Sequence, residues 1–288
     1  MRKDHLMLVT DAGMTLHLGW DYNLPYSIDP LNGVDVTLQT AQGVNQQGVT
    51  IERQSVAGVY RELIVHCWGE TGEADALLLL DSLPYFTSGT LYFGDKWFAR
   101  FAVSKTPYTK QLHPYPVLDM MLFFPKPYWY SLTAESFIIN GFLPSFRLPV
   151  NYAQPHRFGT RTSVGWLNAR NPGALPVPFT ATLRCDSTVV NPHILSVLTG
   201  QTIGFLTTLE PGDTIEIYRT TTDKLAVTRT RDGVTENIFA LLDEDSDLLE
   251  LAPGDNLLKA VADSGKDNLQ VTVSFYPMVS GILPEVMT

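Results

Sequence analysis

Short stretches in which apolar and polar residues alternate dominate this sequence. In residues 59–68, Leu63, Val65 and Cys67 point one way, while the other face holds Glu62, Ile64 and His66. A period of two residues is the signature of a half-buried β-strand. Similar alternation recurs in residues 179–185, 214–220 and 269–277. The chain of 288 residues is long enough for one large domain or two of ordinary size, and the pattern predicts that most of it is β-structure.

Two further stretches of the first half read as strands. Residues 90–103 predict a hairpin, with Gly94 and Asp95 as a two-residue turn that has glycine first. After this turn, alternate apolar residues share one face: Trp97, Ala99, Phe101 and Val103. Residues 117–124 are apolar on both faces except at Asp119, which predicts a central or covered strand.

One helix is predicted, over residues 71–83. Glu73 and Asp75 fall in its first turn, where negative charge suits the helix dipole, and Pro84 ends the run. Three apolar residues follow at helical spacing: Ala74, Leu77 and Leu78. Because helices and strands do not alternate regularly, the first half is expected to be α+β or mostly β.

The composition changes after this region, where several prolines suppress regular strand pairing. They are Pro125, Pro127, Pro144, Pro149 and Pro155. The sequence therefore predicts a linker or domain-crossing segment, with an α+β domain in residues 1–130 and a β-sandwich in residues 131–288. No helix is predicted in the second half, and each half is expected to fold by itself.

Charge and cysteine content exclude several classes of function. A formal net charge of −10 argues against a basic face for nucleic acid, because phosphate contacts need clustered Lys and Arg. Cys67 and Cys185 are too few for a zinc cluster and are expected to be buried thiols. The longest uncharged aliphatic run, residues 77–80, cannot span a bilayer, and the apolar run at the start stops at Asp11. These features predict folding in a cytoplasm.

Residues 241–256, LLDEDSDLLELAPGDN, raise the question of a calcium loop or a catalytic carboxylate cluster. An EF-hand loop that begins Asp243, Asp245, Asp247 requires glycine at position 6 and glutamate at position 12. Those positions hold Leu248 and Gly254. Consecutive acids in a polar run are usually solvated, so the interpretation is an inter-strand loop that binds no metal.

The Pro-Gly-Asp sequence occurs twice, at residues 211–213 and 253–255. Proline and glycine suit the two central positions of a type II turn, since glycine supplies the positive φ. Both copies precede apolar positions, so they are interpreted as turns between strands of a sandwich.

Other sites of chemistry are not predicted. The sequence has no G-x-S-x-G elbow, no phosphate-binding glycine loop and no H-E-x-x-H, and no pair of its six histidines has metal-ligand spacing. A Ser-His-Asp triad assembled only by the fold stays open. The aromatic residues of segment 115–130 could form a ligand platform, but on strands beside prolines they are expected in the core or at a subunit interface. No catalytic, cofactor-binding or metal-binding residue is assigned.

The order of these features resembles the distal tail proteins of long-tailed bacteriophages. In the first half, Arg61 and Glu62 match the family's Arg-Glu strand, and residues 74–103 look like its short helix followed by a Gly-Thr-Leu-Tyr hairpin. Pro127 and Trp129 match the segment that ends its N-terminal domain.

The second half is similar to the family's galectin-like β-sandwich. Asn171 and Gly173 precede a proline-flanked strand, as in the family. Residues 246–256 match its Ser-x-Leu-x-x-Leu-x-Pro-Gly-x-Asn run through Ser246, Leu248, Leu251, Pro253, Gly254 and Asn256. Galectins bind galactosides through a His-x-Asn-x-Arg strand, which none of the histidines begins, so the resemblance does not imply a sugar site.

The resemblance implies a non-enzymatic virion protein at the tail tip, without cofactors. It implies a homohexameric ring built by the N-terminal domains, with the sandwiches outside. The ring would join the tail tube protein to the tip hub and the receptor-binding proteins, and DNA would pass through it unbound. Two alternatives remain: a carbohydrate-binding adhesin module, and a glycoside hydrolase, which needs two opposed carboxylates in a cleft.

Overall fold

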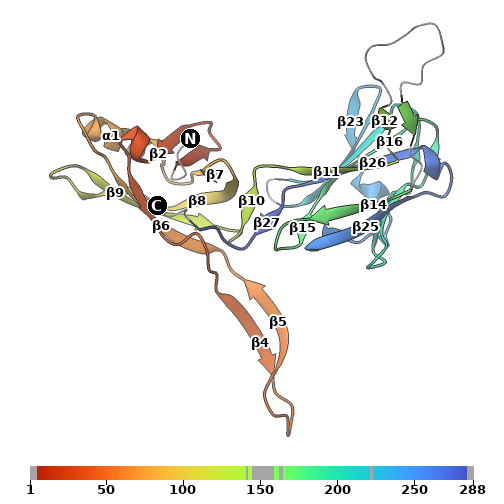
Figure 1. The fold of residues 1–288 in the computed structure, drawn as a ribbon, viewed down its shortest axis with the longest axis horizontal. Coiled ribbons are helices and arrows are strands. Elements are labelled where there is room, and N and C mark those ends of the chain that lie inside the picture. Colours follow the sequence, from red (N-terminus) through yellow and green to blue (C-terminus); the bar gives the residue numbers. More distant parts are fainter. Residues whose placement is uncertain (1–4, 141, 145–158, 162–164, 221–222, 284–288) are drawn as a thin grey trace. The chain divides into compact units, whose positions relative to one another are not determined.

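The chain divides into two units in the computed structural model (Figure 1). The structure describes residues 5–140, 142–144, 159–161, 165–220 and 223–283. Unit 1 contains residues 1–133 and 278–288, and unit 2 contains residues 134–277. The expected assignment of all residues after 130 to the second domain is wrong at the C-terminal end, because strand β27 (Met278–Val279) pairs with β10 (Trp129–Ser131) in unit 1.

An antiparallel sheet forms the body of unit 1. Nine strands of the described residues join it, seven of them in the order β2-β1-β7-β8-β9-β6-β3, while β10 pairs with both β8 and β27. Their bounds are β1 (Leu6–Thr10), β2 (Thr15–Leu18), β3 (Tyr26–Ile28), β6 (Val59–His66), β7 (Ser88–Phe93), β8 (Trp97–Gln111) and β9 (Val117–Phe124). The alternation in residues 59–68 is confirmed, since Leu63, Val65 and Cys67 are fully buried. The central position of residues 117–124 is also confirmed, because β9 lies between β8 and β6.

The predicted hairpin β7–β8 is confirmed, but its turn is longer than expected. Phe93 pairs with Trp97, so three residues, Gly94 to Lys96, connect the strands. Gly94 has φ +57°, which is the left-handed region that glycine adopts without strain.

Helix α1 (Gly72–Ser82) is the only α-helix among the described residues. The expected apolar spacing of Ala74, Leu77 and Leu78 does not mark its buried face. Ala76 and Leu79 are buried instead, whereas Leu77 and Leu78 are 63% and 52% exposed. Four consecutive leucines place apolar side chains all round the helix, so periodicity could not select the face that packs.

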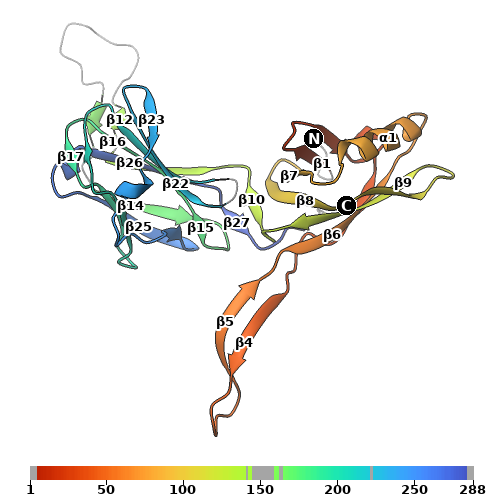
Figure 2. The same cartoon turned by 180° about the vertical axis from the view of Figure 1, so that it is seen from behind.

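A separate two-stranded hairpin, here called the arm, projects from unit 1 (Figures 1 and 2). It consists of β4 (Val36–Ala41) and β5 (Thr50–Val56), which pair antiparallel with a register shift between Gln39 and Thr40. Neither strand pairs with another strand of the described chain. The arm lies between β3 and β6 in sequence.

Unit 2 is a β-sandwich, as predicted. A six-stranded sheet has the order β11-β26-β16-β21-β22-β23, and a four-stranded sheet has the order β14-β25-β18-β19, both counted over the described residues. The bounds of the first are β11 (Glu135–Ile139), β16 (Thr180–Cys185), β21 (Thr214–Arg219), β22 (Leu225–Arg231), β23 (Val234–Asn237) and β26 (Leu269–Phe275). Those of the second are β14 (Trp166–Asn171), β18 (His193–Ser196), β19 (Thr202–Gly204) and β25 (Gly254–Val261).

Short elements complete the chain. Three further strand pairs lie in unit 2: β12 (Phe142–Pro144) with β13 (Gly159–Arg161), β15 (Val177–Pro178) with β24 (Glu250–Leu251), and β17 (Val189–Val190) with β20 (Thr208–Leu209). 3₁₀ turns cover Trp20–Tyr22, Phe239–Leu241 and Lys266–Asn268. The described part of unit 2 therefore has no α-helix, in agreement with the sequence pattern.

The proline-rich segment contains more strand than expected. β10, β11 and β12 all lie in it, although the chain does cross between the units there, after residue 133. Short strands are compatible with proline at their ends. Pro149 and Pro155 lie outside the described residues.

Candidate assembly site

The arm is amphipathic but exposed on both faces. Cross-strand partners share a face of a hairpin, and the pairing places Val36 opposite Val56, with Leu38 next along β4. These three residues are each 49% exposed, and Ile51, on the same face, is 48% exposed. Two uncharged polar residues, Thr40 and Gln54, share this face with the four apolar ones. The opposite face carries Thr37, Gln39, Arg53 and Ser55.

No part of the described chain covers the apolar face of the arm. Twelve of the thirteen residues of the two strands are exposed, and the other, Ala41, is partly exposed. An isolated two-stranded hairpin is marginally stable in water, and strands that alternate in this way normally bury their apolar face. The arm therefore has the pattern of a strand pair that is completed by another surface.

The base of the arm is fixed to the core of unit 1 on the β3 side. Leu31 is fully buried, and its carbonyl accepts hydrogen bonds from Trp129 Nε1 (3.0 Å) and from the amide of Ile282 (3.1 Å). Asn32 Nδ2 donates to the carbonyl of Ile282 (3.2 Å). The predicted family position Trp129 thus holds the segment that leads into the arm.

The two predicted family positions in β6 lie at the other side of this base. The amide of Glu62 donates to Asp29 Oδ2 (2.7 Å), and the amide of Asp29 donates to the carbonyl of Glu62 (3.0 Å). Arg61 is buried, with its guanidinium carbon 5.9 Å from the Phe124 ring centre. Burial lowers the pKa of Arg61, and the charge of Asp29 opposes that shift. Both residues are within six positions of the end of β5, so they shape the base of the arm.

Asp119, the polar exception in β9, is a buried acceptor. Tyr108 donates to its carboxylate (2.6 Å), and Lys110 Nζ lies 3.5 Å from the same oxygen and 3.9 Å from Glu62. Burial raises the pKa of Asp119, but the hydrogen bonds and the Lys110 charge outweigh it, so the pKa lies below its usual value. The carboxylate ties the long strand β8 to β9.

The predicted family positions in unit 2 shape connections between strands. Gly254 has φ +89°, as the type II turn requires. Asn256 closes the same turn: its Oδ1 accepts from the Ala252 amide (2.9 Å), and its Nδ2 donates to the Ala252 carbonyl (2.8 Å). Pro253 precedes the glycine in this turn. The first Pro-Gly-Asp copy is also a turn, because the Asp213 amide donates to the Glu210 carbonyl (3.0 Å).

Asn171 has a comparable structural role. It is 1% exposed, and its Nδ2 donates to the carbonyls of Leu175 (2.9 Å) and Leu251 (3.0 Å). Its Oδ1 accepts from the amide of Gly173 (2.9 Å). Both polar atoms of this side chain are hydrogen-bonded to backbone groups. Asn171 therefore links the connection that follows β14 to the strand β24.

The acidic stretch runs beside β19. The Asp243 amide donates to the Gly204 carbonyl (2.9 Å), and the Asp247 amide donates to that of Thr202 (2.6 Å). Glu244, Asp245 and Asp247 are exposed, as the interpretation of a solvated loop requires.

Asp243 departs from that interpretation. Its carboxylate is half-buried, 3.1 Å from His193 Nε2, and this contact lowers the pKa of Asp243. Sequence reasoning missed this pair because fifty positions separate its members. Among the described residues, no three His, Cys, Asp or Glu side chains gather as metal ligands. The absence of a calcium response stays a prediction.

Two histidines that looked scattered in the sequence come together in unit 1. His5 Nε2 lies 3.0 Å from His17 Nδ1, and the two rings stack at 5.2 Å. Tyr22 packs against both histidines, with ring centres 5.0 Å from His17 and 5.2 Å from His5, so the three rings form one cluster. The β1–β2 hairpin causes this, since it brings the residues around positions 6 and 18 opposite each other. Two histidines alone do not make the three- or four-ligand set that zinc requires.

The cysteines are buried, as expected. Cys67 is fully buried and Cys185 is 6% exposed. Burial raises the pKa of each thiol to about 11, so both are poor nucleophiles at neutral pH.

The described chain also has no helix that combines the length and hydropathy needed to cross a membrane.

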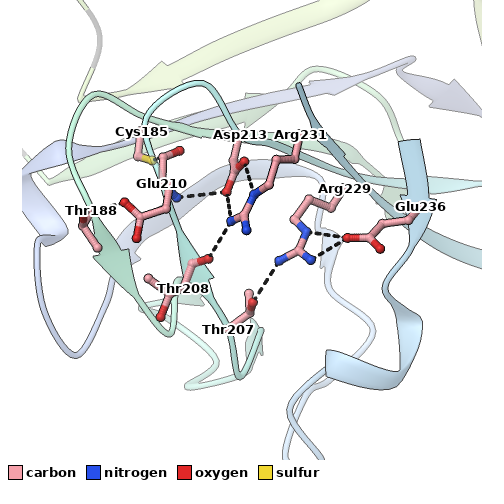
Figure 3. A network of polar contacts seen from close by, with 9 residues as sticks. All are labelled: Cys185, Thr188, Thr207, Thr208, Glu210, Asp213, Arg229, Arg231 and Glu236. Atoms are coloured by element: carbon pink, nitrogen blue, oxygen red, sulfur yellow. Dashed lines mark hydrogen bonds and ion pairs between the residues drawn. The ribbon is translucent and has the colours of Figure 1, made fainter. Parts of the chain in front are cut away.

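A polar network on the six-stranded sheet of unit 2 contains an ion pair with a buried carboxylate, that of Asp213 (Figure 3). Arg231 makes a two-bond contact with Asp213, whose side chain is 2% exposed, and Asp213 also accepts from the amide of Glu210 (2.9 Å). Beside it, Arg229 binds the exposed carboxylate of Glu236 (2.5 Å). The hydrogen bonds from Arg231 lower the pKa of Asp213. The network joins the first Pro-Gly-Asp turn to β22 and β23.

Replacing Asp213 by asparagine should destabilise unit 2 by about 1–3 kcal/mol, because the Arg231 guanidinium and the Glu210 amide lose a buried, charged acceptor. A carboxyl whose folded pKa is lowered contributes stability above its unfolded pKa, about 4, and loses it as the pH falls through the folded pKa. Urea unfolding at pH 7 and pH 3 should therefore show a smaller pH dependence for the variant. Glu236→Gln is the matched control, and its exposed pair should contribute less than about 1 kcal/mol. Equal losses for both variants would contradict the assignment.

The fold defines the class of protein to which the chain is similar. Searches against family models and curated proteins gave no match. Among solved structures, the chain is similar to the SPP1 Dit (gp 19.1) protein, described as a paradigm of the hub adsorption apparatus in phages that infect Gram-positive bacteria. The TM-score is 0.66 at 11% identity, over 95% of this chain and 98% of that chain.

A chain of the phage P2 baseplate in its activated conformation is similar too. With Ca its TM-score is 0.52 at 12% identity, over 95% of this chain and 98% of that chain. The same baseplate with Sr gives 0.52 at 12% identity, over 94% and 97% of the two chains. The chain therefore has the fold of phage tail-tip hub proteins, and the predicted resemblance is confirmed at that level.

Proposed function

We propose that this protein is a structural, non-enzymatic component of a phage tail tip. It forms a homohexameric ring that joins the tail tube to the tip hub and to the receptor-binding proteins. DNA passes through the ring without being bound specifically. The protein resides in the virion, after assembly in the cytoplasm of the bacterial host.

The observation that carries this proposal is the fold likeness to a hub protein over 95% of the chain. It covers both units, so the resemblance is to a whole architecture and not to a common sandwich alone. The arm supports self-assembly, because its apolar face has no cover in the described chain. The net charge of −10 for each subunit favours a wall that repels phosphate groups.

Electron microscopy and light scattering of the purified full chain test the proposal. Six chains of 32.0 kDa should give a ring of about 192 kDa, and rings can stack in pairs. Gel shifts with duplex DNA at moderate salt should show no complex. A protein that stays monomeric at high concentration and binds a glycan through residues 134–277 would instead be the adhesin module.

A further inference from the structure

A second exposed apolar surface lies on unit 1, at the end of α1. It consists of Leu77, Leu78, Tyr85 and Phe86, here called the α1 patch. Leu77 and Leu78 are more than half exposed, Tyr85 is 76% exposed and Phe86 is 95% exposed. Large aromatic residues are seldom left this open on a monomer unless they meet a partner.

The two aromatic residues are held outward by the chain on both sides. Leu83, just before them, is 1% exposed, and the carbonyl of Thr87, just after them, accepts from the amide of Val103 (2.8 Å). Phe86 has φ +64°, a left-handed conformation that is strained for a bulky residue, and its ring meets Tyr85 edge-on at 5.3 Å. Strain of this kind gathers at functional sites.

The arm and the α1 patch cannot cover each other within one subunit. In both views the arm and α1 extend to opposite sides of unit 1 (Figures 1 and 2). Neither surface is part of the described core of the unit. Each subunit therefore carries one apolar ribbon and one apolar patch, both open.

We infer that the apolar face of the arm of one copy docks on the α1 patch of the next copy. This inference rests on the proposed ring. A contact between two different surfaces of the same chain is heterologous, and it closes into a ring when the rotation fits. One such contact per subunit covers both surfaces of every copy. Val36, Leu38, Ile51 and Val56 carry no charge, so the contact buries no unpaired ion.

Single substitutions on the two faces of the arm test the donor surface. Leu38→Glu places a carboxylate on the apolar face, while Gln39→Glu, its neighbour on β4, places the same group on the polar face. Because Leu38 is half exposed in one subunit, its replacement should leave the monomer folded. We expect Leu38→Glu to weaken assembly by about 30-fold or more, as at an interface hot spot, and Gln39→Glu to leave it unchanged. Mass photometry over a dilution series measures both.

Phe86→Asn tests the receiving surface. Asparagine adopts the left-handed region more readily than phenylalanine, so the change removes the ring without adding strain. We expect the variant to lose the hexameric ring while the melting temperature of its monomer stays that of the wild type. Val234→Asn is the control, because it also replaces an exposed apolar side chain by asparagine, at a position of unit 2 that is 69% exposed. It should leave the hexamer intact.

A disulfide crosslink between the arm of one copy and the α1 patch of the next would show the docking directly. A Leu38→Cys/Leu78→Cys double variant should form an oligomer ladder on a non-reducing gel, and a mixture of the two single variants should stop at dimers. The native thiols are buried and should not interfere. Intact hexamers of Leu38→Glu or Phe86→Asn, or absence of the ladder, would overturn this docking while leaving the proposed ring in place. A wild-type chain that forms no ring would overturn both.

Discussion

Replacing Trp129 by alanine should destabilise unit 1 by about 3–5 kcal/mol, the range for large aromatic residues in a core. Trp129 is 2% exposed and packs against Phe93 and Phe124, with ring centres 6.5 and 6.2 Å away. It also donates its indole hydrogen to Leu31 at the base of the arm. The change removes a core side chain and an anchor together. Urea unfolding followed by far-UV circular dichroism measures the loss of stability without relying on tryptophan fluorescence.

Trp129→Phe separates these two contributions. It keeps most of the apolar volume and loses the indole hydrogen bond, while the Leu31 carbonyl keeps the Ile282 amide as a donor. Its cost should therefore be roughly 1–3 kcal/mol, for the lost hydrogen bond and the smaller ring. If Trp129→Ala melts like the wild type, the packing described for unit 1 is wrong.

Phe205→Ala should lower the stability of unit 2 by a similar amount, about 3–5 kcal/mol. Phe205 is fully buried, and its amide donates to the carbonyl of Pro192 (3.0 Å). We expect two unfolding transitions in the full chain, since each unit has its own core. The variant should shift only the unit 2 transition, and Trp129→Ala should shift only the other.

Leu206 provides the neighbouring control for Phe205. It is 54% exposed, so Leu206→Ala should change the stability by about 0.5 kcal/mol or less. A single transition that both core variants shift equally would show that the two units unfold together. Independent folding of residues 134–277 would then fail as well.

The strands with clean alternation could be predicted from the sequence, because burial of one face dictates their period. Val271, Val273 and Phe275 of β26 are all buried, as the alternation indicated. The face of α1 could not be predicted, since leucine fills four consecutive positions. The return of β27 to unit 1 could not be predicted either, because two residues carry no periodicity.

The candidate site was predictable only in part. The motif residues Arg61, Glu62 and Trp129 were identified, and the structure places all three around the base of the arm. The arm was not predicted, because the feature that marks it as a candidate site is the exposure of its apolar face in the folded chain. Val36 and Leu38 look like ordinary half-buried positions in a sequence, and only the folded chain shows that they remain open.

Unit 2 is an insertion within unit 1, and both of its connections are paired strands. The chain leaves through β10 and returns through β27, and these two strands lie antiparallel beside each other. A single proteolytic cut at either crossing therefore leaves the two units joined through the other one. Any pull on unit 2 is shared by two neighbouring strands, one of which continues directly to Ile282 and its bond to Leu31. A load applied at the sandwich thus reaches the segment that leads into the arm through Ile282, three residues beyond β27, without passing through the rest of the sheet.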